Sequence, residues 1–220
     1  MIGVPGSGKG TQAKLIAHKY NYLHLSTGDL LRNLAEKKNL NKKEGEAVSL
    51  MKTGELVPDK IIFSLVFGAI LKTIKEKDGV VLDGAIRNVE QAKGFDIFFK
   101  DNNLQNEILA LEIKISDTES LKRLSMRRVC TKCSEIIPWL DSTKEMQSCP
   151  KCGGELKSRQ DDNLETIKER IKKQGNDAIR AIVKYYSKKK TLVIINGQQD
   201  IQDVEKDVNE KLMNYANQVR

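Results

Sequence analysis

The 220-residue sequence contains few aromatic residues and no long hydrophobic run. Phe, Trp and Tyr together make up 5% of the chain, so a core has to be filled mainly by aliphatic side chains, which the 39% hydrophobic content allows. The sequence has no stretch of about 18 apolar residues that would cross a membrane and no charged, apolar and small-residue pattern of a secretory signal. We therefore expect a cytoplasmic protein with no membrane partner.

Cysteine is also scarce, and its four occurrences are confined to one short segment. Cys130 and Cys133 form one C-x-x-C pair, and Cys149 and Cys152 form another. In a cytoplasmic chain such pairs favour metal binding over disulfides, and four thiolates match the tetrahedral site of structural zinc. Two disulfides, a redox-active pair or an iron–sulfur cluster are the alternatives. Four protein ligands leave no open coordination position, so the metal would be structural.

The net charge of +8 fits several kinds of partner. Nucleic acid, an anionic membrane and phosphorylated small molecules would each be attracted by such a surface. Many lysines fall in patterns typical of exposed helices, such as those at 36–38 and 188–190. Composition alone therefore does not choose among these partners.

Short apolar segments alternate with helical periodicity, which predicts an α/β fold with a parallel sheet wrapped by helices. Residues 1–2 would be the stub of a first strand, shorter than the roughly five residues that are usual. Either the sequence begins inside this strand or the strand is weak. Two segments look inserted into the fold, 27–58 and 129–158. The other predicted strands are 22–25, 80–82, 108–115 and 192–195, and the predicted helices are 11–20, 27–37, 59–77, 161–189 with an interruption at Gly175, and one from about Asp203.

The segment 3–9, GVPGSGK, matches the G-x-x-x-x-G-K phosphate-binding loop. Its glycines let successive backbone N–H groups face one anion, and the helix that follows adds its positive end. Lys9 would reach the terminal phosphates. Gly10 stands where this loop usually has a magnesium-binding Ser or Thr, and Thr11 follows. The alternative is a glycine-rich turn that binds nothing.

Asp83 ends an apolar strand, at the edge where a parallel sheet forms its ligand crevice. Its carboxylate would hold magnesium, through water because that ion keeps much of its hydration shell. The alternative is an aspartate that caps the next turn. Arginines bracket the cysteine segment, and Arg123 and Arg127 are four apart and share a helix face. The bracketing arginines are Arg123, Arg127 and Arg128 before the segment, Arg159 after it and Arg170 further along.

Several motifs, in order over nearly the whole chain, resemble those of adenylate kinases and their nucleoside monophosphate kinase relatives. They are GSGKGTQ at 6–12, LSTGDLLR at 25–32, GELVP at 54–58, DG at 83–84 with Arg87 and Gln91, the cysteine pairs, the arginines and Asp161–Asp162. The resemblance implies a P-loop three-layer fold with a five-stranded parallel sheet. It also implies a core of 1–26, 59–128 and 159–220, a helical monophosphate-binding insert at 27–58 and a zinc-ribbon lid at 129–158.

The implied activity is reversible, Mg²⁺-dependent transfer of a phosphoryl group from ATP to AMP, giving two ADP. Positioning and positive charge under a closing lid would provide catalysis, and the protein would be a monomer with no nucleic-acid partner. The implied catalytic residues are Lys9, Asp83, Arg87, Arg123, Arg127, Arg159 and Arg170. The implied ATP-binding residues are Gly6, Ser7, Gly8, Lys9, Gly10, Thr11, Arg127, Ile136, Ile137 and Gln199. The implied AMP-binding residues are Thr27, Arg32, Glu55, Leu56, Val57, Gly84, Ala85, Ile86, Arg87, Gln91, Arg159 and Arg170.

Two segments depart from the family pattern. Ala85 and Ile86 replace the usual Phe-Pro before the arginine, and Ile136-Ile137-Pro138-Trp139 stands where a Tyr-His is common. Three alternatives therefore stay open. They are a kinase of the same fold that uses UMP, CMP or GMP, a family member that binds nucleotide but turns over poorly, and a zinc-containing nucleic-acid-binding module.

Overall fold

A computed structural model describes residues 1–73, 76–105, 108–159 and 161–219. Its central strands form two parallel pairs. β1 (Leu23–Ser26) pairs with β2 (Val80–Asp83), and β3 (Ala110–Lys114) pairs with β7 (Leu192–Asn196). Because the paired strands are parallel, their carboxyl ends lie together, with Ser26 opposite Asp83 in one pair. This confirms the predicted α/β class.

Residues 1–2 lie between the two strand pairs. Ile2 forms an isolated parallel bridge with Glu112 in β3, and its backbone nitrogen donates to the carbonyl of Leu111 at 2.7 Å. The backbone nitrogen of Met1 donates to the carbonyl of Leu82 in β2 at 2.7 Å. The predicted first strand is therefore present as a short bridging segment among the described residues.

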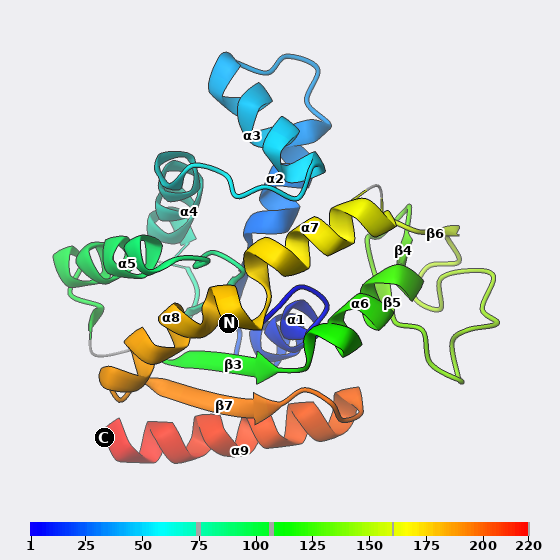
Figure 1. The fold of residues 1–220 in the computed structure, drawn as a ribbon. Helices are drawn as coiled ribbons and strands as arrows, with labels where there is room; N and C mark the ends of the chain where they lie inside the picture. The colour runs from blue at the N-terminus through cyan, green and yellow to red at the C-terminus, as the bar shows by residue number, and fades with distance from the viewer. Residues whose placement is uncertain (74–75, 106–107, 160, 220) are drawn as a thin grey trace.

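Helices cover both faces of the strands (Figure 1). On one face, α1 (Lys9–Lys19) and α9 (Ile201–Val219) pack on a cluster that includes Ile16, Leu111 and Val208. On the other face, α5 (Val89–Asp101) and α8 (Asn176–Lys188) contribute to a cluster that includes Ala92 and Ile182. Both clusters are largely aliphatic, as the composition predicted.

The five phenylalanines gather in one place, between α4 (Asp59–Thr73) and α5. Phe67 and Phe98 stack with their ring centroids 4.1 Å apart, and Phe95 meets Phe67 edge-on at 5.1 Å. Phe63 and Phe99 complete the group. The phenylalanines thus pack α4 against α5. Residues 74–75 of the predicted helix 59–77 lie outside the described residues.

The first inserted segment folds as α2 (Thr27–Ala35) and α3 (Lys42–Lys52). The Ser26 hydroxyl accepts a hydrogen bond from the backbone of Asp29, and Asn41 and Glu44 form a capping box. These caps satisfy backbone donors that the first helical turn leaves free. Leu31, Leu34, Ala47 and Val48 of the two helices are buried together.

The second inserted segment is a small antiparallel sheet. β4 (Arg128–Cys130) lies between β5 (Ile136–Ile137) and β6 (Leu156–Lys157), and it follows directly after α6 (Asp117–Met126). Figure 1 shows α2 and α3 at the top of the molecule and the small sheet at its right, next to α7 (Leu164–Gln174).

Most element boundaries differ from the predicted ones by a few residues. The long predicted helix 161–189 is divided into α7 and α8 at Gly175, as its glycine suggested. A Cβ at Gly175 would lie 2.3 Å from the carbonyl oxygen of Ile171, so a side chain would not fit this junction. Helix α9 begins two residues before the predicted Asp203. Among the described helices, none has the length and apolar run needed to span a bilayer.

Candidate active site

The glycine-rich loop 3–9 curls from the first strand into α1. Gly3 has a φ of +148°, and a Cβ there would lie 2.6 Å from the carbonyl oxygen of Ile113. Only glycine fits such a close approach. The first turn of α1 contains no acidic residue of its own, and its N-terminal backbone donors face the loop. This arrangement is a ready-made anion site.

Lys9 begins α1 and lies among positive and negative groups. Its Nζ donates to the carbonyl of Val4 at 3.2 Å. Burial lowers the pKa of Lys9 to about 8, and the neighbouring Arg87 and Arg170 add to this effect while Asp83 opposes it. A buried ammonium so close to losing its proton would be stabilised by a bound anion.

Asp83 at the end of β2 stays ionised despite its burial. Burial alone would raise its pKa, but the adjacent His24 imidazole and the charge of Lys9 lower the pKa of Asp83 to about 2. His24 Nε2 lies 3.6 Å from Asp83 Oδ2. The carboxylate is therefore a permanent negative charge beside the phosphate loop.

Gly10 lies directly against this carboxylate. A Cβ at Gly10 would be 2.8 Å from Asp83 Oδ2, closer than such atoms approach in proteins. The glycine at this position, where a Ser or Thr was the usual expectation, gives Asp83 room to approach the first turn of α1.

A cavity of about 630 Å³ opens beside the loop. Its floor is the loop and Asp83, one end is lined by residues of α2, and the other end by the lid and the segment between β7 and α9. Its lining includes Pro5–Gln12, His24, Ser26, Gly28, Asp29, Arg32, Asp83, Gly84, Arg87, Lys122, Arg123, Met126, Arg127, Ile136, Pro138, Trp139, Leu140, Arg159, Arg170, Gly197–Ile201 and Val204. A chamber of this size suits phosphorylated small molecules.

Two aspartates organise the arginines on one wall of this cavity. Asp162 accepts two hydrogen bonds from Arg127, at 2.7 and 2.8 Å, and one from Arg170 at 3.1 Å. Asp161 accepts from Arg170 at 3.2 Å. On α6, Arg123 donates to Glu119 at 2.7 Å and to the carbonyl of Gly197 at 3.0 Å. These contacts hold long flexible side chains in fixed positions.

The arginines also repel one another. Burial lowers the pKa of Arg159 to about 10, and the charges of Arg127 and Arg32 contribute. Burial likewise lowers the pKa of Arg87 to about 10, with Arg170 contributing. The guanidinium groups remain charged at neutral pH, and a ligand with several negative charges would relieve this crowding.

The α2 end of the cavity is held by short hydrogen bonds. The Thr27 hydroxyl donates to the carbonyl of Gly84 at 2.8 Å, and Arg87 Nε donates to the same carbonyl at 2.9 Å. Gln91 accepts from the backbone of Arg87 at 2.7 Å and donates to Asp59 at 2.8 Å. Arg32 is paired with Asp29 at 2.6 Å.

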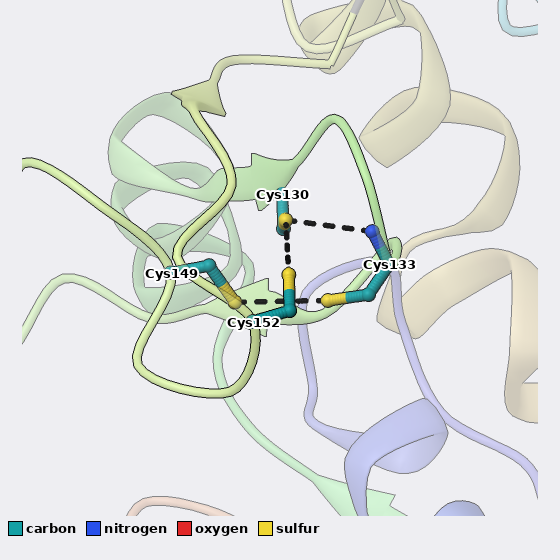
Figure 2. Close-up of side chains that lie close together, drawn as sticks. All are labelled: Cys130, Cys133, Cys149 and Cys152. Carbon is teal, nitrogen blue, oxygen red and sulfur yellow. Dashed lines mark hydrogen bonds between the residues drawn. The ribbon is translucent and has the colours of Figure 1, made fainter.

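The four cysteines converge at one point of the lid (Figure 2). Their sulfur atoms all lie within 4.8 Å of one another. The Cys130–Cys152 and Cys133–Cys149 sulfur separations are 3.5 and 3.6 Å, far longer than a disulfide bond of about 2.05 Å. Four sulfurs around zinc at about 2.3 Å would be nearly 3.8 Å apart, so the cluster has the dimensions of a tetrahedral thiolate site.

Backbone N–H groups favour the thiolate form of Cys130, one of the four cysteines. Burial raises the pKa of the Cys130 thiol, but the backbone N–H groups of Cys133 and Lys132 outweigh it and lower that pKa to about 6. A Cβ at Gly154 would lie 2.8 Å from the Cys130 sulfur, so glycine is needed beneath the cluster. The thiols are free and partly to fully buried.

Comparison with known proteins decides the family. The adenylate kinase family model matches residues 1–191. An adenylate kinase of Petrotoga mobilis is 38% identical over 219 residues, covering 99% of this chain and 98% of the relative. An adenylate kinase of Borrelia turicatae is 39% identical, covering 97% and 98%, and one of Archaeoglobus fulgidus is 37% identical, covering 94% of each. The chain belongs to the adenylate kinase family. This confirms the predicted family, the kinase class and the adenylate kinase activity.

Most of the residues that the resemblance to adenylate kinases predicted line the cavity. Those lining it are Gly6, Ser7, Gly8, Lys9, Gly10, Thr11, Arg32, Asp83, Gly84, Arg87, Arg123, Arg127, Ile136, Arg159, Arg170 and Gln199. The other predicted residues lie outside that lining. Thr27 and Gln91 lie behind it, Ala85, Ile86 and Val57 pack in the core, Leu56 is half-buried, Glu55 pairs with Lys173, and Ile137 is buried in β5. The roles of all these residues in an adenylate kinase stay predictions.

Some lining residues were missed in the sequence. Ile201 and Val204 line the cavity from the first turn of α9, and the sequence offered no motif at either residue. Met126 lines the cavity from the end of α6, one residue before Arg127, and no sequence motif marked it. His24 and Lys122 also line the cavity, and no motif marked either residue.

Proposed function

We propose that this chain transfers the terminal phosphoryl group of ATP to AMP, reversibly, giving two ADP. One observation carries the proposal: the phosphate loop, Asp83 and a converging set of arginines line a single cavity that has one end at α2 and another at the lid. The size of the cavity and its excess of positive groups favour two phosphorylated ligands. The relatives named above are adenylate kinases, which supports the choice of ATP and AMP.

The donor phosphates would lie against the loop. Backbone N–H groups of Gly6, Gly8 and Gly10 and the ammonium of Lys9 would bind them, and Thr11 would add a hydroxyl. The donor base would then lie toward the lid end, near Ile136 and Gln199. Because anion binding favours the protonated lysine, Lys9 would hold its proton more strongly with phosphate present.

The acceptor would occupy the α2 end. Arg32 and Arg87 would bind its phosphate, because a planar guanidinium matches two phosphate oxygens. Arg123, Arg127, Arg159 and Arg170 would neutralise charge on the group in transfer. Asp161 and Asp162 hold two of these arginines in place, so little reorientation is needed.

Asp83 fits a magnesium site. Its ionised carboxylate is an oxygen ligand of the kind that Mg²⁺ prefers, it lines the cavity, and Gly10 leaves space beside it. Magnesium bound with ATP would neutralise charge on the donor oxygens. Asp83 would orient it, through water, and Lys9 would flank the same phosphates.

The cysteine cluster fits a structural zinc. Cys130, Cys133, Cys149 and Cys152 would supply all four ligands, leaving no position for a reacting group. The lid is too short for a core of its own, so its fold would depend on the metal. Lid closure over the cavity would exclude water from the transfer.

The proposed activity also divides the chain into a core, an acceptor insert and a lid. The core would consist of 1–26, 59–128 and 159–220, the acceptor insert of 27–58 and the lid of 129–158. Residues 1–2, bonded to both β2 and β3, would make the two strand pairs into one five-stranded parallel sheet. The monomeric state, the cytoplasmic location and the lack of a nucleic-acid partner stay predictions.

Substitution of Lys9 or Arg127 tests the proposal. We expect Lys9→Met and Arg127→Ala to lower turnover by about 100-fold or more, since each removes a charge aimed at the phosphates. Lys19→Met, on the exposed side of α1, is the control and should keep wild-type turnover. The measurement is the initial rate of ADP formation from ATP and AMP, with thermal unfolding to show that each variant is folded. Near-normal turnover in both site variants would contradict the proposal.

A further inference from the structure

Gln174, the last residue of α7, connects two parts of the molecule that no sequence motif joins. Its Oε1 accepts a hydrogen bond from Arg87 Nη1 at 2.8 Å, and its Nε2 donates to the carbonyl of Gly54 at 3.2 Å. The side chain is buried. An arginine can only donate and a carbonyl can only accept, so these two partners fix the orientation of the amide.

The Gly54 end of this connection belongs to the acceptor insert. Gly54 lies in the turn between α3 and α4 with a φ of +79°, and a Cβ there would be 2.8 Å from Arg170 Cγ. The next residue, Glu55, pairs with Lys173, which also lies 3.1 Å from Glu169. The turn of the insert therefore rests on the last two turns of α7, against the stem of a predicted catalytic arginine.

The Arg87 end belongs to the predicted acceptor phosphate site. Arg87 lines the cavity, and its guanidinium is held by the Gly84 carbonyl through Nε and by Gln174 through Nη1. Arg170 lies close enough to disfavour the charge on Arg87. A buried guanidinium under such repulsion needs acceptors that fix its direction, and Gln174 supplies one of them.

We propose that Gln174 is a positioning residue for the acceptor phosphate, which sets the direction of Arg87 according to where the turn at Gly54 lies. A movement of the insert would then change the direction of the Arg87 guanidinium through the Gln174 amide. The inference rests on the proposed function, because it takes Arg87 to bind the phosphate of AMP. It adds a residue that lies outside the lining of the cavity.

Steady-state kinetics of Gln174→Met test the inference. Methionine keeps the length of the side chain and its helix propensity, but it has no N–H to donate to Gly54 and only a weakly accepting sulfur for Arg87. We expect the KM for AMP to rise by roughly 10- to 100-fold, as for loss of a hydrogen bond to a charged group, with the KM for ATP within about twofold. Gln174→Ala should show the same split. Gln202→Met, at an exposed position of α9 outside the cavity lining, is the matched control and should show no change in either KM.

A double-mutant cycle tells whether Gln174 acts through Arg87. In an Arg87→Ala background, Gln174→Met should change the KM for AMP by less than about twofold, because the arginine to be positioned is gone. Thermal unfolding shows whether each variant is folded. If Gln174→Met does not fold, Gln174→Ala replaces it in the cycle.

Three results would overturn the inference. They are an unchanged KM for AMP in a folded Gln174 variant, an equal rise in the KM for both substrates, and a full effect of Gln174→Met without Arg87. Failure of the proposed function looks different, because the wild-type protein would then form no ADP from ATP and AMP.

Discussion

Gly10 shows how one residue adapts a general loop to its surroundings. The loop motif alone suggested a Ser or Thr after Lys9, yet any side chain there would meet Asp83 Oδ2 at 2.8 Å. The sequence shows the glycine but not why a glycine is needed there, because Asp83 lies 73 positions further along the chain. Only the folded chain brings the two together.

Substitution of Gly10 should therefore displace the carboxylate. We expect Gly10→Ala to raise the KM for MgATP or lower turnover by roughly 10- to 100-fold, as for a small misplacement at the reacting groups. Gly45→Ala in α3, where a Cβ meets no atom within 4 Å, is the matched control and should leave both parameters unchanged. Initial rates at varied MgATP make the comparison. Equal kinetics in the two variants would show that Asp83 tolerates the displacement.

The pKa of Lys9 predicts an alkaline limit to activity. With a pKa of about 8 in place of 10.5, Lys9 loses its charge as the pH rises through about 8. We expect kcat/KM for MgATP, which reports the free enzyme, to fall above that pH. Because the unfolded chain still binds this proton up to about 10.5, Lys9 makes the free energy of unfolding increase with pH between the two values.

Arginine at the same position provides the comparison for this limit. Arginine keeps its charge throughout this pH range, so kcat/KM of Lys9→Arg should not fall near pH 8. This holds even if the highest kcat/KM of the variant is lower than that of the wild type. The measurement is kcat/KM for MgATP from about pH 6 to pH 10 in both proteins. A wild-type profile that stays flat to pH 10, or the same fall in both proteins, would contradict the assignment to Lys9.

The replaced residues Ala85 and Ile86 have a clear structural setting. Ala85 is buried in the cluster that also contains the phenylalanines, and Ile86 packs against the clusters on both sides. These apolar side chains fill the core between Asp83 and Arg87, so both charged residues still line the cavity. The sequence indicated a departure at this point, and the packing shows that both replaced residues lie against the core.

At the scale of elements, local chemistry predicted types better than boundaries. Gly175 marked the break between α7 and α8, because its missing side chain and the carbonyl of Ile171 occupy the same space. The strands were recognised from short apolar runs and the helices from their apolar periodicity, and neither signal fixes the first residue of an element. Helix α9 starts at Ile201, directly after Asp200, whose carbonyl accepts from the backbone of Val204, so the prediction at Asp203 was two residues late.

The lid should depend on its metal while the rest of the chain does not. None of the described lid residues 129–158 belongs to the buried clusters formed by the strands and the helices around them. We therefore expect Cys149→Ser to lose zinc and to lower turnover by about tenfold or more, because an unfolded lid cannot exclude water. The helices of the core should remain.

Metal analysis and spectroscopy of the same samples check this expectation. Wild type should contain about one zinc per chain, and Cys149→Ser close to none, with far-UV circular dichroism largely kept. Trp139, the single tryptophan, lies in the lid, so its emission should change. Ser142→Ala, at an exposed lid position, is the control. Retention of zinc by Cys149→Ser, or collapse of the whole chain, would contradict the account.

At the scale of the whole molecule, the order of motifs predicted more than any single motif. Each motif could be recognised from the sequence by itself, including the P-loop, the strand that ends at Asp83 and the arginines. Their meeting in one cavity depends on crossovers that bring distant strands together. The sheet is the least predictable part, because the role of residues 1–2 is set by hydrogen bonds to β2 and β3. The Gln174 connection had no sequence signal, since both of its partners are distant in the chain.

The excess positive charge is explained in part at this scale. Arg32, Arg87, Arg123, Arg127, Arg159 and Arg170 face one cavity, while lysines such as Lys188 and Lys189 lie exposed on α8 and at its end. The arginines favour a small polyphosphate inside the molecule as the partner. The acceptor remains the point on which the whole account depends.

One measurement tests the central claim most directly. Purified protein with ATP and Mg²⁺ is given AMP, UMP, CMP or GMP in separate reactions, and ADP formation is followed. We predict fast ADP formation with AMP and little with the other three. Faster ADP formation with another monophosphate would show that the acceptor is not AMP, while the phosphoryl-transfer mechanism would stand. No turnover with any acceptor, in folded protein that contains zinc, would contradict the account.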